Sequence, residues 1–376
     1  MNKTPTKKRI FKILTVPLSW IYNGITSFRN FLYDAKILET HEFETPVISI
    51  GNITVGGTGK TPHTECIVSM LKDAFDITIL SRGYKRKTKG FIKANLQSTV
   101  AQIGDEPLQM ARKFANTPNV SVAVCEDRAF GIKKIEKDST DNSKVLVVLD
   151  DAFQHRKVTP CVNILLVDYN RQIFDDHLLP WGNLRESPKE YARANIVVIT
   201  KCPDNLKPID RRVIAQHTHL LPNQAIFFTS FKYLQPKMIF ENTFGMPEIN
   251  NDTHILLLTG IANADPLVNY VKAEISNHLT HLSFGDHHNF TTSDISNIVK
   301  TFNGINSSNK VLITTEKDAM RLRDINFADD LKKRMCYLPI EVNFIFNDKE
   351  NLKKLILKYV EGNKANYKLH TTVRQF

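Results

Sequence analysis

Cysteine is scarce in this sequence, and the few cysteines are not spaced for cross-links or metal binding. The 376-residue chain has 5 Cys, none of them in a C-x-x-C pair. A disulfide framework and a zinc–thiolate site are therefore not indicated, and this usage is typical of a reducing compartment.

The amino-terminal part lacks a hydrophobic run long enough to cross a bilayer. Its longest charge-free segment, residues 13–28, has 16 residues and includes Ser, Asn and Thr, whereas a spanning helix needs about 20 mostly apolar residues. Apolar residues recur there at spacings of three and four, which predicts an amphipathic helix kinked or interrupted at Pro17. We expect this helix, behind a basic leader with Lys3 and Lys7, to lie on a membrane surface. A helix packed on its own domain is the alternative, and a signal peptide is disfavoured because no small-residue cleavage site follows.

Acidic residues are too few to balance the basic ones. The formal net charge is +11, and the first 100 residues hold 15 Lys and Arg against 7 Asp and Glu. A basic amino-terminal portion favours an anionic partner, such as a membrane surface, a phosphorylated substrate or nucleic acid. Nucleic acid is disfavoured, because the basic loop at residues 81–87 offers only Tyr84 for stacking on bases.

A glycine-rich segment, GNITVGGTGKTP at residues 51–62, follows a predicted short buried strand and precedes a predicted helix. Such a loop directs backbone N–H groups inward and binds phosphates, with the lysine on the outer phosphates and the next hydroxyl on Mg²⁺. Thr54 occupies the usual position of the first glycine, so the Gly56-Gly57 doublet is expected to supply the backbone freedom. The predicted nucleotide-binding residues are Thr54, Val55, Gly56, Gly57, Thr58, Gly59, Lys60 and Thr61.

A continuous apolar run at residues 144–149 ends in two adjacent acids, Asp150 and Asp151. A buried strand that delivers an aspartate beside a phosphate loop is a common way to bind Mg²⁺. We therefore predict a metal site formed by Thr61, Asp150 and Asp151.

Strand and helix signals alternate over the first 200 residues and again, on a smaller scale, after residue 254. This pattern predicts an α/β protein with a P-loop NTPase-like, mostly parallel sheet flanked by helices and a second, smaller α/β domain. The pattern becomes irregular and contains several prolines from about residue 203 to residue 253. The expected divisions are a leader and helix at 1–35, a P-loop domain at 36–230, a linker at 231–253, the smaller domain at 254–360 and a tail at 361–376.

Two further polar positions suit proton chemistry. Asp105 is expected either to cap a helix or to present a carboxylate to the site. His287 stands beside Asp286 without a third ligand at metal spacing, which disfavours zinc and leaves proton handling or loop hydrogen bonds.

Ten short words follow one another along the chain: GNITVGGTGKTP (51–62), SRGY (81–84), GDEP (104–107), EDR (126–128), DD (150–151), FQH (153–155), LRE (184–186), GIAN (260–263), FGDHH (284–288) and TEKD (315–318). Taken together, these words resemble the tetraacyldisaccharide 4'-kinase (lipid A 4'-kinase) family. Two positions, Ala152 and Ala264, depart from the residues usual in that family.

The resemblance implies transfer of the ATP γ-phosphate to the 4'-hydroxyl of a tetraacyldisaccharide 1-phosphate lipid, with Mg²⁺, at the cytoplasmic face of the bacterial inner membrane. It also implies that Asp105 is the catalytic base, paired with His287 from the second domain. The implied supporting or substrate-binding residues are Tyr84, Arg128, His155 and Glu186.

Two other functions fit the motifs. A membrane-associated GTPase or ATPase switch would hydrolyse nucleotide without a lipid acceptor. A nucleotide-gated scaffold would bind ATP without forming a phosphorylated product.

Overall fold

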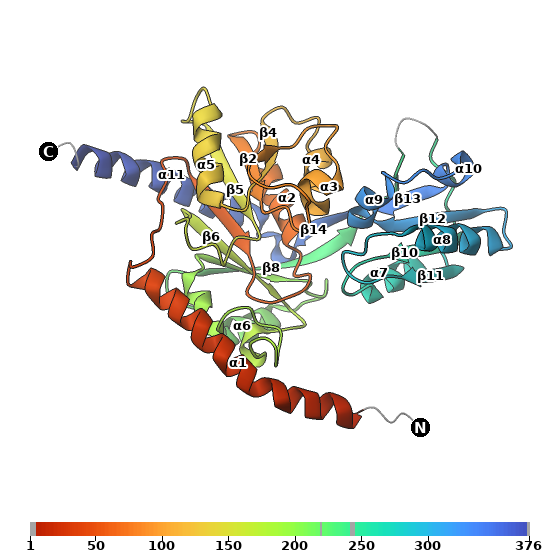
Figure 1. The fold of residues 1–376 in the computed structure, drawn as a ribbon, viewed down its shortest axis with the longest axis horizontal. Coiled ribbons are helices and arrows are strands. Elements are labelled where there is room, and N and C mark those ends of the chain that lie inside the picture. The colour runs from red at the N-terminus through yellow and green to blue at the C-terminus, as the bar shows by residue number, and fades with distance from the viewer. Residues whose placement is uncertain (1–4, 219, 241–244, 374–376) are drawn as a thin grey trace.

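The computed structural model describes residues 5–218, 220–240 and 245–373, with side chains described from residue 15 to residue 363 outside the two internal gaps. Two sheets organise the chain (Figure 1). The larger has nine strands in the order β14-β8-β7-β6-β1-β5-β2-β4-β3, and the smaller has five in the order β11-β10-β12-β13-β9. We call each sheet with its helices the larger unit and the smaller unit. The predicted α/β fold with a mostly parallel sheet flanked by helices is confirmed.

The larger sheet is parallel except at its two edges. Its central strands are β1 (Val47–Gly51), β5 (Val145–Asp150), β2 (Asp76–Ser81), β4 (Val120–Val124), β6 (Val162–Asp168), β7 (Ile196–Thr200) and β8 (Ala225–Tyr233). The edge strands β3 (Ile92–Lys93) and β14 (Ile340–Phe344) pair antiparallel with β4 and β8. Parallel strands end at one edge of a sheet, so the loops after β1, β2, β4 and β5 meet there.

Helices cover both faces of this sheet because successive strand residues point to opposite sides. Ile48 and Ile50 of β1 pack in a core shared with α2 (Lys60–Leu71), α4 (Asp105–Lys113) and α11 (Lys349–Val373). Val47, the residue before Ile48, packs on the other face in the core that contains α5 (Arg128–Asp138). The short helix α3 (Val100–Ile103) precedes α4.

The smaller unit repeats this architecture. Its strands are β10 (His254–Thr259), β11 (Leu279–Ser283), β12 (Lys310–Thr315), β13 (Met335–Leu338) and the antiparallel β9 (Lys237–Met238). Its helices include α7 (Asp265–Tyr270), α8 (Thr292–Gly304), α9 (Glu316–Leu322) and α10 (Asp329–Lys332). Ile103 and Leu108 of the larger unit share a core with Ala319 and Leu322 of α9. The two units are therefore packed together along α4 and α9.

The segment expected to be irregular, residues 203–253, is more regular than predicted. It contains α6 (Pro208–His217) and β8, and Pro208 lies in the first turn of α6, where the missing N–H is not needed. The sheets also divide the chain at different points from the expected boundaries: β9, in the expected linker, joins the smaller sheet, and β14 returns to the larger one. The number of prolines in this segment predicts neither its regular elements nor the division between the sheets, because proline is accepted at the start of a helix and at the end of a strand.

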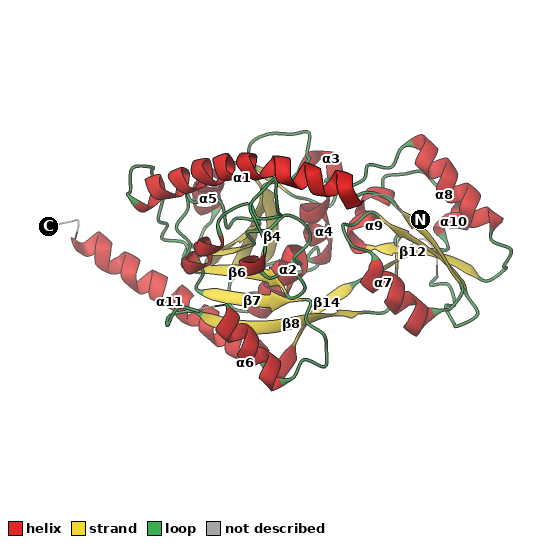
Figure 2. Ribbon diagram, turned by 90° about the horizontal axis from the view of Figure 1, so that it is seen from below, coloured by secondary structure: helices red, strands yellow, loops and turns green. Residues whose placement is uncertain are grey.

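Helix α1 (Pro5–Asp34) runs along one side of the larger unit (Figures 1 and 2). It continues through Pro17, since one proline removes a single backbone hydrogen bond and α1 extends more than three turns on either side. The side chains of the basic leader lie outside the described residues. Within 5–218, 220–240 and 245–373, no helix has both the length and the apolar character needed to cross a bilayer.

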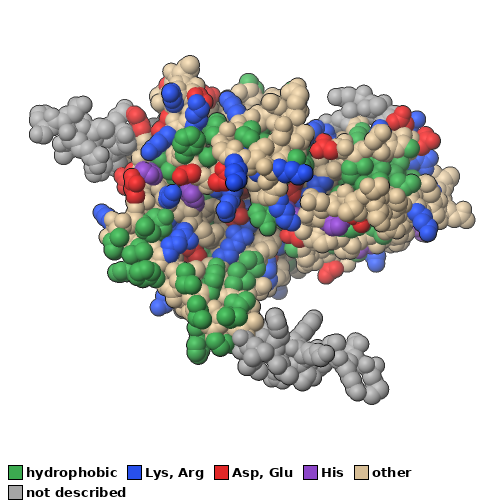
Figure 3. All heavy atoms as spheres, in the orientation of Figure 1, with side chains coloured by type: hydrophobic (Ala, Val, Ile, Leu, Met, Phe, Trp, Pro, Cys, Tyr) green, Lys and Arg blue, Asp and Glu red, His purple; other side chains and the backbone are tan. Residues whose placement is uncertain are grey.

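The polar side of α1, and not its apolar side, contacts the protein. Ser19 Oγ donates to the Leu178 carbonyl at 2.9 Å, and Tyr22 donates to the Arg185 carbonyl at 2.9 Å. The apolar side faces outward and forms a continuous hydrophobic surface in Figure 3. Its members are each more than half exposed: Leu18, Trp20, Ile21, Ile25, Phe28 and Phe31.

Candidate active site

The glycine-rich loop connects β1 to α2 and ends at a glycine that no other residue could replace without strain. Gly59 precedes α2 with φ 87°, and a Cβ there would lie 2.5 Å from Phe231 Cζ. Gly56 also has positive φ, at 94°, whereas Gly57 has open space around it and no such φ. Of Gly56 and Gly57, which were expected to supply backbone freedom, only Gly56 adopts a conformation that favours glycine. No side chain caps the start of α2, so the N–H groups of its first turn are available to an anion.

Three of the predicted nucleotide-binding residues shape this loop from within. The Asn52 amide donates to Thr58 Oγ1 at 2.8 Å and to Thr54 Oγ1 at 3.3 Å, and both threonines are buried. The Val55 N–H donates to the Asn183 carbonyl at 2.8 Å. Thr54, Val55 and Thr58 thus stabilise the loop conformation, while Gly59, Lys60 and Thr61 lie where the loop meets α2.

The two predicted metal-binding aspartates lie at the end of β5, where Asp150 is its last residue and Asp151 follows it. Lys60 Nζ lies 3.7 Å from Asp151 Oδ1, and Arg185 Nη1 lies 3.4 Å from the same oxygen. Asp150 is buried and accepts from Thr64 at 3.1 Å and from Ser81 at 3.3 Å. Burial, followed by the charges of Glu106 and Asp151, raises the pKa of Asp150 to about 7.

This donor set fits Mg²⁺. Crowded carboxylates that raise one another's pKa are relieved by a divalent cation between them. Among the described residues, no cluster of three or more His, Cys, Asp or Glu is arranged to hold a metal. Two carboxylates with a hydroxyl match a cation that is bound mainly by substrate phosphates and water.

Asp105 and His287 meet at the contact between the two units. Asp105 is the first residue of α4, whose N-cap is Gly104, so the expected capping role belongs to the glycine. His287 Nδ1 lies 3.0 Å from Asp105 Oδ2. Lys317 Nζ lies 2.9 Å from His287 Nε2 and 3.0 Å from Glu106 Oε1. An ammonium only donates, so Nε2 accepts and the Nδ1 proton is donated to Asp105.

The charge around Asp105 is strongly positive. Arg321, also from α9, donates through Nη2 to Asp105 Oδ2. Burial alone would raise the pKa of Asp105, but the hydrogen bond from His287 and the charges of Lys317 and Arg321 hold it well below its usual range. Asp105 is therefore ionised at neutral pH.

The four predicted supporting residues lie in three different environments. The Tyr84 ring meets the His287 ring edge-on, 5.3 Å between centroids, beside the Asp105 pair. Arg128 is buried near the aspartate pair, and burial lowers its pKa to about 10 against the opposing charges of Asp150 and Asp151. His155 Nε2 accepts from the Arg128 N–H at 3.3 Å, and burial together with the Arg128 charge lowers its pKa to about 4.

Glu186 has a different environment. It is buried, pairs with Arg193 at 2.6 Å and accepts from Asn30 of α1 and from Gln154, each at 3.3 Å. Gln154 in turn donates to the Asn52 carbonyl at the start of the phosphate loop. Glu186 therefore links α1 to the loops of the site.

Comparison with known proteins agrees with this geometry. The sequence pattern described as tetraacyldisaccharide-1-P 4'-kinase matches residues 11–361. The chain belongs to this family. The tetraacyldisaccharide 4'-kinase of Phocaeicola vulgatus is 44% identical over 353 residues, covering 93% of this chain and 95% of the relative. That of Bacteroides thetaiotaomicron is 43% identical over 360 residues, covering 93% of each. A solved structure of LpxK from Aquifex aeolicus in complex with ATP is similar at a TM-score of 0.71 and 29% identity, covering 93% of this chain and 99% of that chain. The family resemblance expected from the motifs is thus confirmed.

Four charged residues at the site were not predicted from the sequence: Glu106, Arg185, Lys317 and Arg321. The first three lie inside the words GDEP, LRE and TEKD, next to residues that were predicted or named there. Arg321 lies three residues after Asp318 on α9, a spacing that places the two on one helix face. That spacing predicts an Asp318–Arg321 pair but not its contact with Asp105.

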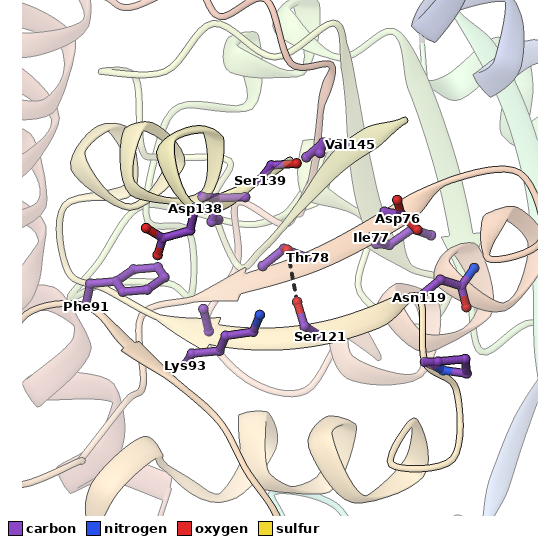
Figure 4. A pocket seen from close by; sticks show the side chains of 13 residues that line it. Asp76, Ile77, Thr78, Phe91, Lys93, Asn119, Ser121, Asp138, Ser139 and Val145 are labelled. Carbon is purple, nitrogen blue, oxygen red and sulfur yellow. Dashed lines mark hydrogen bonds between the residues drawn. The ribbon is translucent and has the colours of Figure 1, made fainter. Parts of the chain in front are cut away.

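A separate hollow of about 210 Å³ lies elsewhere on the larger sheet (Figure 4). Thr78 and Ser121, paired at 3.0 Å between their hydroxyls, form part of its wall, with Phe91 and Lys93 beside them. None of the predicted nucleotide, metal or catalytic residues lines it. The candidate active site is therefore defined by its side chains and not by this hollow.

Proposed function

We propose that this protein transfers the γ-phosphate of ATP to the 4'-hydroxyl of a tetraacyldisaccharide 1-phosphate lipid. The observation that supports this proposal is an Asp105–His287 pair formed from two units, next to Glu106, whose charge acts on Asp150 of the aspartate pair beside the phosphate loop. The kinase names of the relatives and the ATP of the solved relative support it. The reaction forms a bond from the sugar oxygen to the γ-phosphorus and breaks the bond from that phosphorus to the β–γ bridging oxygen, which leaves with ADP.

The phosphate-binding side of the site is the junction of the glycine-rich loop with α2. The free N–H groups of the first turn of α2 and Lys60 bind the phosphates and offset their charge. Mg²⁺, when bound, neutralises charge on the β- and γ-phosphates, and Thr61, Asp150 and Asp151 are the residues that would hold it. Arg128, buried beside the aspartates, adds a fixed positive charge.

Asp105 accepts the proton of the sugar hydroxyl. It is ionised, and His287 orients it by donating from Nδ1. A positioned carboxylate assists a hydroxyl that is a poor nucleophile by itself. Because His287 and Asp105 belong to different units, docking of the smaller unit onto α4 completes the site and excludes water that would otherwise hydrolyse ATP.

We further propose that α1 attaches the protein to the cytoplasmic face of the bacterial inner membrane as a peripheral or monotopic protein. The outward apolar side chains of α1 would enter the lipid boundary, and its inward polar side chains contact the loops at Arg185, Glu186 and Gln154. A lipid acceptor held at the surface would then reach the site without leaving the bilayer. The excess positive charge of the chain favours an anionic surface.

The test is incubation of the purified protein with ATP, Mg²⁺ and the disaccharide 1-phosphate lipid, followed by mass spectrometry of the lipid. We expect a gain of one phosphate at the 4' position, and no gain with Lys60→Ala. ADP formation without phosphorylated lipid would favour the nucleotide switch. Nucleotide binding without ADP or phosphorylated lipid would favour the scaffold.

A further inference from the structure

The smaller unit delivers a guanidinium to Asp105 in addition to the imidazole of His287. Arg321 contacts the same oxygen, Oδ2, that His287 contacts. We propose that Arg321 is a positioning residue for Asp105, which turns the carboxylate so that Oδ1 faces the acceptor hydroxyl. This inference rests on the proposed kinase function and adds a residue to its site.

Arg321 is itself held rigidly. Its Nη1 donates to Asp318 Oδ1 at 2.9 Å, and its side chain is only 5% exposed. Asp318 is completely buried, and its Oδ2 accepts from the Gly260 N–H at 2.8 Å and from Thr315 Oγ1 at 2.7 Å. A guanidinium presents donors in a fixed planar fork, so anchoring one nitrogen on Asp318 fixes where the other points. The fork therefore sets the position of Asp105 relative to the smaller unit.

Counting acceptor positions on Asp105 identifies the oxygen that remains for substrate. Each carboxylate oxygen accepts about two hydrogen bonds. Oδ2 is occupied by His287 and Arg321, whereas Oδ1 accepts from the Glu106 N–H at 2.9 Å. Oδ1 thus keeps one position for the hydroxyl of the acceptor, and this arrangement lasts as long as Arg321 occupies Oδ2.

The contact with Arg321 also makes Asp105 a weaker base. The strength of this base determines at which stage of phosphoryl transfer Asp105 accepts the proton. Phosphoryl transfer passes through a loose transition state in which the hydroxyl becomes acidic only as its bond to phosphorus forms. A carboxylate of low proton affinity accepts the proton late, after most of the bond change. Charged and titratable groups from both units surround Asp105. They are His287, Asp286, Lys317, Asp318 and Arg321 from the smaller unit, and Tyr84, Lys85 and Glu106 from the larger unit.

The experiment compares Arg321→Met and Arg321→Lys with the wild type in the lipid phosphorylation assay, measuring kcat and KM from pH 4 to pH 9. Arg321→Met removes both the fork and its charge. We expect its kcat to fall about 100-fold, with KM for ATP and lipid within about threefold. The acid limb of the kcat profile lies below pH 4 in the wild type, because the pKa of Asp105 is held below its usual range. In Arg321→Met it should move upward by about 1 to 3 pH units, toward or into the measured range, because an opposite charge beside Asp105 is lost.

Arg321→Lys keeps the charge and loses the fork. Its kcat should fall about tenfold while the acid limb stays near that of the wild type. Arg334→Met is the matched control, since Arg334 belongs to the same unit and donates to the Ser308 carbonyl; it should change neither quantity. Thermal unfolding of each variant shows whether it is folded, and if Arg321→Met does not fold, the lysine variant decides.

The inference is overturned if Arg321→Lys retains full kcat, or if both variants lose kcat and neither moves the acid limb. An equal upward shift of the acid limb in both variants also overturns it. Arg321→Lys keeps the positive charge and should therefore leave the acid limb near that of the wild type. If the wild type phosphorylates no lipid, the proposed function fails first and the role of Arg321 fails with it.

Discussion

His287 Nδ1 lies 3.0 Å from Asp105 Oδ2, although 182 residues separate the two along the chain. Asp105 begins α4 of the larger unit, and His287 follows β11 of the smaller unit with a positive φ of 54°. Their contact coincides with the packing of α9 against α4, where Ile103 and Leu108 share a core with Ala319 and Leu322. The apolar contact between the units and the acid–imidazole pair therefore form together.

Gly59 should be the least replaceable residue of the phosphate loop. Gly59→Ala places a methyl group 2.5 Å from Phe231 Cζ in a backbone region with φ 87°, and we expect it to destabilise the fold by about 1 to 3 kcal/mol and to weaken ATP binding. Gly57→Ala is the matched control, because nothing lies within 4 Å of its Cβ position. Urea unfolding and ATP titration measure both effects, and equal behaviour of the two variants would contradict this account of the loop.

His155 should make folding stability depend on pH. Its pKa in the folded protein is lowered to about 4 from 6.5, so the unfolded chain binds a proton between these values and the folded protein does not. Stability from this group is present above pH 6.5 and is lost as the pH falls toward 4, with a slope of about 1 kcal/mol per pH unit. His155→Gln keeps an acceptor for the Arg128 N–H without titrating. Urea unfolding at pH 7, 6, 5 and 4 should show a shallower decline for the variant, and parallel curves would refute the assignment.

The outward face of α1 should bind lipid. Replacing Trp20 and Ile25, which are 70% and 66% exposed, by serine removes apolar surface without touching the contacts of α1 with the protein. We expect binding to vesicles of phosphatidylethanolamine and phosphatidylglycerol to fall at least about tenfold. Leu96→Ser is the control, because Leu96 is 71% exposed and lies outside α1. Equal vesicle binding by all three proteins would show that α1 is not the contact surface.

Metal removal should abolish transfer, and the aspartate pair should account for it. Chelation with EDTA is expected to stop lipid phosphorylation and added Mg²⁺ to restore it. Asp151→Asn should lower kcat by at least about 100-fold, because a metal ion supplies several kcal/mol of charge stabilisation in such reactions. Asp175→Asn, in an exposed position outside the site, is the control. Unchanged activity of Asp151→Asn at limiting Mg²⁺ would remove this residue from the metal site.

Local patterns in the sequence account for much of the larger unit. The apolar runs at residues 46–50 and 144–149 become the buried strands β1 and β5, and the loop and aspartates that follow them are brought together because parallel strands end at the same edge. Strand β8 was not anticipated, since its buried residues include Thr229 and Ser230 and it follows a proline-rich segment. Strand β14 lies within residues 254–360, which were expected to form the smaller domain, but it pairs with β8 of the larger sheet, because pairing across more than 100 residues leaves no local pattern.

The same limit applies to the site. Asp105 and His287 were predicted through the family words that contain them, but Arg321 lies outside any such word. Its contact with Asp105 spans 216 residues and depends on how α9 packs on α4. Glu186 was predicted as a supporting residue, and its contacts with Asn30 and Arg193 show a structural link to α1 that spacing along the chain does not reveal.

The most direct test of the central claim is a double-mutant cycle on Asp105 and His287 in the lipid phosphorylation assay. Asp105→Ala and His287→Ala should each lower kcat strongly, and the double variant should lose less than the sum of the two losses in free energy, because residues that act as a unit are not additive. Fully additive losses would contradict a working pair, and so would wild-type kcat in either single variant.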